Sequence, residues 1–382
     1  MLRRLTIGLR YSRKEAWVGG LYYVRNLVRA LGLLPEGRRP RLVVIGGDLA
    51  SLQDLREATD YQDLRRISRA RLKRAPAPRL GWPTTGESID LILMGSPPAL
   101  EDRGVQWVPD FQEHRFPRFF PEDELKARYR RNEDWFARHR HVMVSSQDVA
   151  SDLERYYGRL GAQVHVARFA VFNEADLQST DIVSLKARYG LPGRYFICAN
   201  QFWRHKNHGL VLRALAEAGS DPGAPPMVFT GLEQDHRDPA YGPSVRTLAA
   251  ELGVGDRVRF LGFIPRADQL GLMAGAIAVV QPSLCEGWST VVEDAKSAGR
   301  HVLASDIAVH REQLQSGVDF FAPEDAAALA GLLRRHSEQD PPPRTGDYRL
   351  EQQRFSRDLW AMIRTVERDF RRRKVEQILI NG

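Results

Sequence analysis

A regular alternation of short apolar runs with helical patterns constrains the fold of this chain more than any other feature. Ten runs rich in Val, Ile and Leu recur along the 382 residues, five in each half. In chain order they are LTIGL, RLVVIGG, DLILMG, VQWVP, HVMVSS, YFICAN, PMVFTG, VRFLGF, AIAVVQPS and HVLASD. Apolar strands separated by helices are typical of parallel sheets buried on both faces. We therefore predict an α/β fold with two doubly wound, Rossmann-like domains.

The predicted domain boundary lies in the polar segment FNEADLQST, which follows Val171. We place the first domain at residues 1–175 and the second at residues 176–347. A proline-rich segment, SEQDPPPRTGD, precedes an amphipathic helix over about 348–382, which we expect to cross back onto the first domain. Ligands of open parallel sheets bind at the carboxyl ends of the strands. The loops that follow the strands should therefore carry the function, in a cleft between the domains.

Composition excludes several classes of protein. The chain is 43% hydrophobic and 27% charged, as in a soluble globular protein. No apolar run approaches the roughly 18 residues of a membrane span, and the start MLRRLTIGLRY lacks the apolar core of a signal peptide. Two cysteines, Cys198 and Cys285, are too few for a disulfide framework or a zinc site. We expect a cytoplasmic protein.

The net charge is +8, and the sequence pI is about 9.6. Basic residues gather in RRISRARLKRAPAPR (Arg65–Arg79) and RRRK (Arg371–Lys374). Such stretches can attract nucleic acid, anionic lipid or phosphorylated substrates, but each alone is explained as solvated surface. No nucleic-acid-binding motif accompanies them, so we expect no nucleic-acid partner.

The stretch CEGWSTVVEDAKSAG places three carboxylates, Glu286, Glu293 and Asp294, at a strand-to-helix junction. With Thr290 as the N-cap, Glu293 falls at the third helical position, so TVVE is predicted to form a capping box. Asp294 is a carboxylate in the first turns of a helix, which is favourable for the helix dipole. Among the three carboxylates, Glu286 is the least well explained by a structural role, because it directly follows an apolar strand and precedes Gly287. It is the leading candidate for chemistry.

A second candidate segment is NQFWRHKNHG, in which Arg204 and Lys206 precede a helix predicted to begin near Asn207. Cations at a helix N-terminus oppose the helix dipole unless an anion binds there. The pattern therefore favours a diphosphate site, although the P-loop motif is absent. We expect His205 and His208 to be exposed to solvent or to cap the helix.

Three further loops leave alternatives open. Gly19 and Gly20 precede a helix and either expose backbone N–H groups to an anion or form a tight turn. The pair Phe263-Ile264 either stacks on a base or packs in the core.

The loop after VQWV contains Asp110 and His114. They could form an acid/base pair or serve as polar caps. Spacing alone does not decide between these two roles.

Taken together, these segments resemble the family 4 glycosyltransferases of the GT-B fold. The most family-specific part of the resemblance is VVQPSLCEGWSTVVEDAKSAGRHVLASDIAVHREQL (Val279–Leu314). In it Glu-Gly comes after Pro-Ser, and seven residues separate Glu286 from a second acid. VRFLGFIPRADQLGLMAGA, NQFWRHKNHGLVLRAL and the early Gly-Gly resemble family segments in the same order. The resemblance spans nearly the whole chain, and it is specific for the family but not for a sugar.

The resemblance implies transfer of a sugar from a nucleotide-diphosphate donor, with retention of configuration and without metal or another cofactor. It implies that Glu286 faces the donor sugar and that Arg204 and Lys206 neutralise the diphosphate. The ungapped register puts the ribose ligand at Asp294, whereas Glu293 would need a one-residue deletion.

Other family contacts carry over less directly. The resemblance implies phosphate contacts from the backbone of Trp288, Ser289 and Thr290, base contacts from Phe263 and Ile264, and first-domain contacts at Gly19 and Gly20. Two departures stand out. The family His-Asp reads Pro109-Asp110 here, with His114 as a nearby substitute. The family Arg falls on Gln201, so Arg204 must serve instead.

We therefore expect a retaining sugar transferase of bacterial surface polysaccharide, O-antigen or capsule assembly. Its acceptor is a saccharide or a lipid-linked saccharide, and the basic surface would favour peripheral association with an anionic membrane at the inner face of the cytoplasmic membrane. The alternatives are a nucleotide-sugar epimerase or phosphorylase of the same fold, and a basic polyanion- or membrane-binding protein. The last leaves the Glu286 loop unexplained.

Overall fold

The computed structural model describes residues 4–13, 18–46, 48–67, 89–95, 103–219, 221, 223–342 and 344–381. The chain divides into two compact units. The first consists of Met1–Phe111, Ala127–Phe172 and Arg349–Gly382, and the second of Gln112–Lys126 and Asn173–Tyr348. The predicted boundaries were 175/176 and 347/348. The segment Gln112–Lys126, which sequence reasoning placed in the first domain, groups with the second unit.

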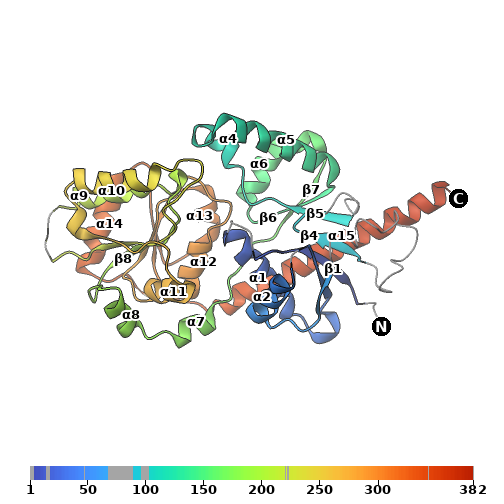
Figure 1. The fold of residues 1–382 in the computed structure, drawn as a ribbon, viewed down its shortest axis with the longest axis horizontal. Coiled ribbons are helices and arrows are strands. Elements are labelled where there is room, and N and C mark those ends of the chain that lie inside the picture. The colour runs from blue at the N-terminus through green and yellow to red at the C-terminus, as the bar shows by residue number, and fades with distance from the viewer. Residues whose placement is uncertain are drawn as a thin grey trace. The chain divides into compact units, whose positions relative to one another are not determined.

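The first unit is built on a parallel sheet of seven strands in the order β3-β2-β1-β4-β5-β6-β7 (Figure 1). The strands are β1 Thr6–Arg10, β2 Arg41–Ile45, β3 Leu64–Ile67, β4 Leu91–Leu93, β5 Gly104–Trp107, β6 His141–Val144 and β7 Gln163–Val166. The five predicted runs of this half are all strands. Sequence reasoning missed β3 and β7. Of the predicted basic stretch, residues 68–79 lie outside the described residues.

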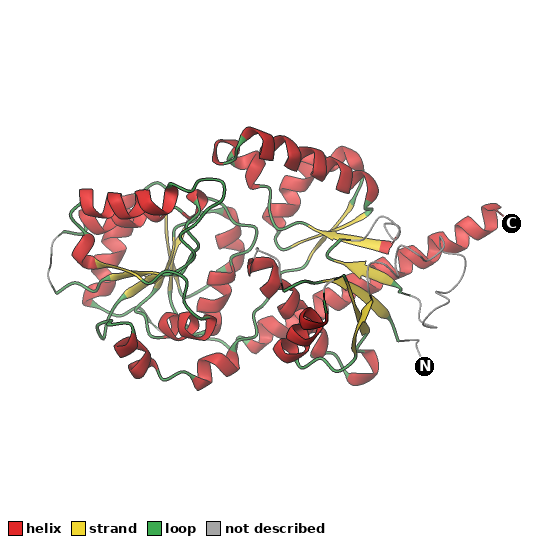
Figure 2. Ribbon diagram, viewed as in Figure 1, coloured by secondary structure: helices red, strands yellow, loops and turns green. Residues whose placement is uncertain are grey.

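Helices cover this sheet on both faces (Figure 2). The described α-helices of this half of the chain are α1 Val18–Gly32, α2 Leu49–Thr59, α4 Gln112–Arg115, α5 Glu122–Arg138 and α6 Gln147–Tyr157. The last helix, α15 Arg349–Asn381, packs against α1 within the same unit. Its predicted apolar face is buried, at Phe355, Leu359, Met362, Ile363 and Val366.

The second unit contains a parallel sheet of six strands in the order β10-β9-β8-β11-β12-β13. The strands are β8 Phe196–Cys198, β9 Met227–Phe229, β10 Val258–Phe260, β11 Val279–Gln281, β12 Val302–Ser305 and β13 Val318–Phe321. The five predicted runs are again strands, and β13 was missed. This 3-2-1-4-5-6 order is that of a doubly wound nucleotide-binding sheet. The predicted architecture of two Rossmann-like units is confirmed.

Two apolar layers sandwich this second sheet. Alternate strand residues, such as Phe196 and Ile197, belong to opposite layers. One layer contains residues of α9 His208–Glu217, α10 Tyr241–Glu251 and α14 Ala326–Glu338. The other contains residues of α8 Ile182–Arg188, α11 Arg266–Ala274 and α12 Thr290–Ser297. The other α-helices among the described residues of this half are α7 Glu174–Ser179 and α13 Ala308–Gln313.

The strand order reverses once in each sheet, between β1 and β4 and between β8 and β11. At such a switch point the loops after the two strands run in opposite directions and leave a crevice at the carboxyl ends. Among the described helices, none combines the length and the apolar character needed to cross a membrane.

Candidate functional site

The switch point of the second sheet brings together the two leading candidates from sequence. Strand β8 leads into a short 3-10 helix, Arg204–Lys206, and β11 leads into the loop that carries Glu286. Lys206 Nζ donates to Glu286 Oε1 at 2.5 Å, across 80 residues of sequence. The two side chains are only 14% and 8% exposed. A part-buried ion pair therefore marks the place where a doubly wound sheet binds its ligand.

Two amides orient the carboxylate of Glu286. Gln281, the last residue of β11, donates its Nε2 to Glu286 Oε1 at 2.8 Å. Asn200, just beyond β8, donates its Nδ2 to Gln281 Oε1 at 3.0 Å and so links the two strands. Both donors to Glu286 use Oε1, and within the described part of the chain Oε2 accepts no hydrogen bond. Glu286 therefore has an acceptor atom to offer a ligand.

The backbone before α9 holds Lys206 in place. Asn207 adopts a left-handed conformation with φ of 56°, which asparagine tolerates better than most residues. Its Nδ2 donates to the carbonyl oxygens of Pro282 at 3.2 Å and Pro323 at 2.9 Å. Leu284 N–H donates to the carbonyl of His205 at 2.8 Å. The Lys206 and Glu286 loops are thus joined by backbone contacts as well as by their side chains.

His205 and His208 are not exposed, so that prediction is wrong. Their exposed fractions are 2% and 0%. The His208 ring stacks on Phe202, with centroids 4.3 Å apart. Burial lowers the pKa of both rings, that of His208 to about 3. The reason is the apolar layer beneath this loop, against which neutral rings can pack. Lys206 is therefore the cation of this loop that is largely shielded from solvent.

Arg204 lies in a different environment from Lys206. Its side chain is 53% exposed and forms an ion pair with Asp238. Its guanidinium also lies 5.8 Å from the ring centroid of Tyr241. The predicted role of Arg204 at a diphosphate stays a prediction, and in this structure it requires release from Asp238.

Helix α12 begins one residue earlier than the capping prediction required. Ser289 is the N-cap, and its Oγ accepts a hydrogen bond from Val292 N–H at 3.3 Å. Glu293 is then the fourth helical residue, so the predicted capping box with Thr290 as N-cap is wrong. Ser and Thr are both good N-caps, and here the serine hydroxyl reaches the N–H three residues on.

The first turn of α12 leaves two backbone donors free. Gln313 clamps Ser289, since its Oε1 accepts from Ser289 N–H at 3.2 Å and its Nε2 donates to Ser289 O at 2.8 Å. The predicted phosphate contact from Ser289 N–H is therefore engaged within the protein. The N–H groups of Thr290 and Val291 donate to none of the described residues. They point from the positive end of the helix, as an anion site requires.

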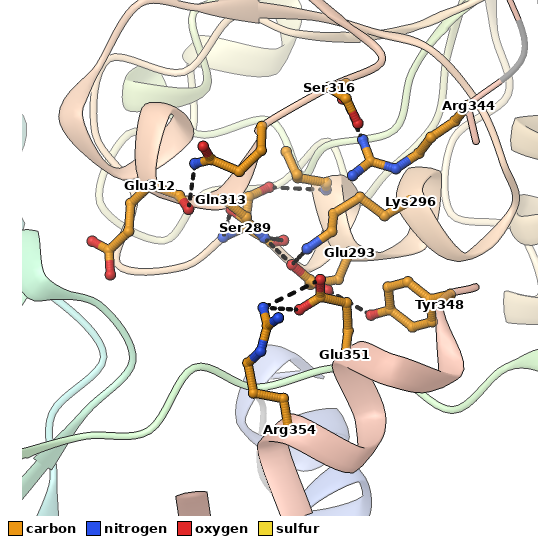
Figure 3. A network of polar contacts seen from close by, with 12 residues as sticks. Ser289, Glu293, Lys296, Glu312, Gln313, Ser316, Arg344, Tyr348, Glu351 and Arg354 are labelled. Carbon is orange, nitrogen blue, oxygen red and sulfur yellow. Dashed lines mark hydrogen bonds and ion pairs between the residues drawn. The ribbon is translucent and has the colours of Figure 1, made fainter. Parts of the chain in front are cut away.

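Glu293 has a structural place, shown in Figure 3. Its Oε1 accepts from Lys296 Nζ and Gln313 Nε2, both at 2.8 Å, and its Oε2 accepts from Tyr348 OH at 2.5 Å. The residue is only 1% exposed. Both carboxylate oxygens of Glu293 therefore accept hydrogen bonds within the protein. Through Gln313, Glu293 holds the start of α12 in place.

Asp294 is fully buried and faces a different set of partners. Its Oδ1 accepts from Arg266 at 2.5 Å and from Asn173 Nδ2 at 3.2 Å, whereas its Oδ2 is buried without a partner. Burial raises the pKa of this carboxyl group, although Arg266 opposes that shift. Sequence reasoning did not select Arg266, and the basic residue that follows Pro265 was the available signal.

The matches to known proteins fall on this site. Residues 186–349 match the family described as "Glycosyl transferases group 1". That segment contains Lys206, Glu286 and Asp294.

Two curated relatives are partial matches. One is the O-antigen chain mannosyltransferase RfbU of Salmonella typhimurium, 23% identical over 196 residues, which are 51% of this chain and 50% of the relative. The other is D-inositol 3-phosphate glycosyltransferase 1 of Catenulispora acidiphila, 26% identical over 201 residues, which are 50% of this chain and 48% of the relative. The chain thus spans about half the length of the curated relatives it matches.

Solved structures match over the full length. Anabaena Alr3699/HepE in complex with UDP has a TM-score of 0.61 at 16% identity and covers 99% of this chain and 100% of its own. Sucrose-phosphate synthase from Thermosynechococcus elongatus has a TM-score of 0.62 at 17% identity, with the same coverage. WaaG, a glycosyltransferase involved in lipopolysaccharide biosynthesis, has a TM-score of 0.57 at 14% identity, over 93% of this chain and 94% of its own. These matches confirm the predicted GT-B fold.

Phe263 and Ile264, the residues predicted to contact the base, lie in different environments. The turn after β10 is made by Gly262, whose φ is 66°. Phe263 is 66% exposed, whereas Ile264 is 8% exposed and packs in a core layer with Leu272 and Val292. Phe263 is thus available to stack on a base, and Ile264 anchors the turn. Trp288 is half-buried, and Gly287 is buried beside Glu286.

The first-half candidates lie outside the matched segment. Gly19 and Gly20 are inside the first turn of α1, not before it as predicted, because the helix begins at Val18. Their N–H groups are still among the four that a helix leaves unpaired within itself. Asp110 follows β5 in the first unit, whereas His114 lies on α4, which groups with the second. Burial lowers the pKa of the His114 ring.

Proposed function

We propose that this chain is a retaining family 4 glycosyltransferase that moves a sugar from a nucleotide-diphosphate donor to a saccharide or lipid-linked saccharide. The observation that carries the proposal is the part-buried Lys206–Glu286 pair at the switch point, next to the free N–H groups that start α12. The family match over residues 186–349 supports sugar transfer. A nucleotide sugar as donor is supported by the complexes of Alr3699/HepE with UDP and with UDP-glucose.

In the proposed mechanism, Lys206 neutralises the diphosphate as it becomes the leaving group. An ammonium that is 14% exposed acts in a medium of low dielectric constant, where its attraction for developing charge is larger than in water. The N–H groups of Thr290 and Val291 add fixed dipoles aimed at the same anion. Arrival of the diphosphate gives Lys206 a second anionic partner beside Glu286.

Glu286 then meets the donor sugar. Gln281 continues to hold Oε1, so the carboxylate keeps its orientation while Oε2 accepts hydrogen bonds from sugar hydroxyls. Asp294 is the proposed ribose ligand, with Phe263 against the base. Since Lys206 and the helix start already supply positive charge at the diphosphate, we propose that catalysis requires no metal ion.

The pathway that we propose is assembly of bacterial surface polysaccharide, such as O-antigen or capsule, at the inner face of the cytoplasmic membrane. Similarity to an O-antigen mannosyltransferase and to WaaG supports this assignment. The net charge of +8 favours peripheral association with anionic lipid.

The test begins with a thermal-shift screen of UDP-, GDP- and dTDP-sugars, because a donor that binds the folded state raises its melting temperature. The donor that binds is then incubated with and without acceptor saccharides. We expect nucleotide release that depends on the acceptor, persists in EDTA and falls in Glu286→Ala. Lys126→Ala is the control, since that side chain is 60% exposed and pairs only with Glu122 in an exposed helical contact. Binding of no donor, or equal turnover in Glu286→Ala, would contradict the proposal.

A further inference from the structure

Three side chains converge at the end of the second sheet opposite to the Glu286 site. His301 directly precedes β12, Asp319 is the second residue of β13, and His336 lies in the last turn of α14. Strands β12 and β13 are parallel neighbours, with Leu303 paired to Asp319. Because Glu286 follows the carboxyl end of β11, a residue at the amino end of β12 belongs to the other edge of this parallel sheet.

The potential ligand atoms of this trio lie close together. His301 Nε2 and His336 Nε2 are each 2.8 Å from the same oxygen, Asp319 Oδ2. One ligand atom from each residue lies within 4.8 Å of the others, and the two rings have centroids 5.3 Å apart. Two imidazoles and one carboxylate are a common set of three protein ligands for zinc.

The trio is held rigidly and is reachable from solvent. His301 and His336 are 6% and 4% exposed, whereas the Asp319 side chain is 25% exposed. Helix α14 is fixed by Leu329 and Leu333, which belong to a core layer. The ligands therefore sit on strands and a packed helix, and an ion can enter from the side of Asp319.

Hydrogen bonding alone does not satisfy this cluster. Arg335 contacts Asp319 Oδ2 and also lies 3.0 Å from His336 Nε2. A ring nitrogen can donate to the carboxylate or accept from the guanidinium, but it cannot do both. The Nδ1 atoms of His301 and His336 are buried without a partner among the described residues, and each would carry the ring proton when Nε2 binds a metal. A divalent cation would satisfy both Nε2 lone pairs and the carboxylate at once. Arg335 is 54% exposed and can move into solvent when an ion arrives.

We propose that His301, Asp319 and His336 bind a divalent transition-metal ion of the zinc class, with water in the fourth position. The ion would tie β12, β13 and α14 together and serve stability, not sugar transfer. In its absence Arg335 acts as the local counter-cation and competes with the metal. This proposal is independent of the proposed function.

Cobalt(II) is the probe for the first test, because its visible d–d absorption reports tetrahedral coordination. Tag-free, chelator-stripped protein is titrated with Co²⁺ and then with Zn²⁺. We expect tetrahedral absorption bands that saturate at one Co²⁺ ion per chain and disappear as Zn²⁺ displaces Co²⁺. In His336→Gln we expect the affinity for Co²⁺ to fall at least ~10-fold. His236→Gln is the control, since that histidine is 74% exposed. Absence of the bands in wild type, or equal bands in His336→Gln, would overturn the proposal.

A second test leaves the ligands intact, so it holds even if His336→Gln does not fold. Arg335→Gln removes the competing cation and should bind Zn²⁺ more tightly and gain more in melting temperature on Zn²⁺ addition than wild type. Arg334→Gln is the matched control, because Arg334 is the neighbouring helical arginine and donates to the carbonyl of Glu217. Equal Zn²⁺ affinities for the two variants would overturn the proposal.

Discussion

Polar clusters beside the first-numbered strand of each sheet, β1 and β8, differ in how completely their groups are paired. In the first unit, Tyr11 follows β1, and Arg25 of α1 donates to Asp54 of α2 at 2.7 and 2.9 Å. Tyr11 OH contacts the same carboxylate and accepts from Arg25 at 3.2 Å. Both oxygens of Asp54 are therefore engaged, and the Arg25 and Asp54 side chains are 23% and 24% exposed.

At the second switch point the ion pair is more deeply buried and is not saturated. Lys206 and Gln281 share Oε1 of Glu286, and Oε2 receives no hydrogen bond from the described residues. Two N–H groups at the start of α12 are also unpaired by those residues. Topology thus fixes where a ligand can bind, and the unused hydrogen-bonding groups of the described residues mark the second switch point as an anion site.

The largest expected effect tests this contrast directly. Lys206→Ala removes a partly desolvated cation from the proposed diphosphate site, so kcat/KM should fall by about 10²–10³-fold, as for other preorganised groups that stabilise developing charge. Arg25→Ala removes the cation of the α1–α2 ion pair in the first unit and should change kcat/KM by less than ~10-fold. Steady-state kinetics of both variants with the same donor measure the difference. Equal losses of kcat/KM in Lys206→Ala and Arg25→Ala would contradict the proposed difference between the two ion pairs.

The strands that sequence reasoning missed are all edge strands, whereas the remaining edge strand, β10, was found from its run VRFLGF. The missed strands β3, β7 and β13 have the sequences LRRI, QVHV and VDFF. Each lies at an edge of its sheet. An edge strand is less buried than a central one and carries polar or charged residues, so it lacks the continuous apolar run that identified the others.

The site shows a similar limit. Glu286 and Lys206 were found because a charge beside an apolar strand, or before a helix N-terminus, is unusual. Gln281 and Gln313 were missed, because a neutral amide gives no such signal and its partners lie at distances that only tertiary packing sets. The N-cap error between Ser289 and Thr290 has another cause, since two adjacent residues have nearly equal capping preference.

The two adjacent acids of α12, Glu293 and Asp294, are predicted to differ in their effect on donor binding. Asp294→Asn removes a charged acceptor, so the donor KM should rise by about 10-fold or more, as expected for loss of a hydrogen bond to a charged group. Glu293→Gln is its control and should keep donor KM and kcat, because the amide oxygen of Gln can still accept from Gln313 and Lys296 and so keep the start of α12 in place. Initial rates across donor concentrations give both constants. An unchanged KM in Asp294→Asn would exclude its proposed contact with the ribose.

The clamp on Ser289 should have a smaller effect. Gln313→Ala releases both backbone groups of Ser289 and removes one donor from buried Glu293, at a cost of about 1–3 kcal/mol in the free energy of unfolding. The start of α12 would become less ordered, so we expect a donor KM raised a few-fold and a kcat nearly unchanged. Urea unfolding and kinetics measure the two effects. Gln315→Ala, an exposed change beyond α13, should alter neither, and a stable Gln313→Ala with unaltered KM would show that the clamp does not position the helix.

The last prediction concerns the pH dependence of stability and compares one histidine from each unit. The pKa of His208 is lowered to about 3 and that of His165, in the first unit, to about 4, in both cases chiefly by burial. In the unfolded chain each ring takes up a proton near pH 6.5, so the unfolded state binds more protons and stability falls as pH drops from about 6.5 towards the folded-state value. His208→Phe should keep the packing on Phe202 and flatten the dependence of the unfolding free energy on pH between about 6.5 and 3, with little change at pH 8. Urea melts at several pH values test this. His165→Phe should flatten only the part above about pH 4. Identical pH profiles for wild type and His208→Phe would mean that His208 takes up its proton at the same pH in the folded and unfolded chains, which would contradict a ring kept neutral by burial.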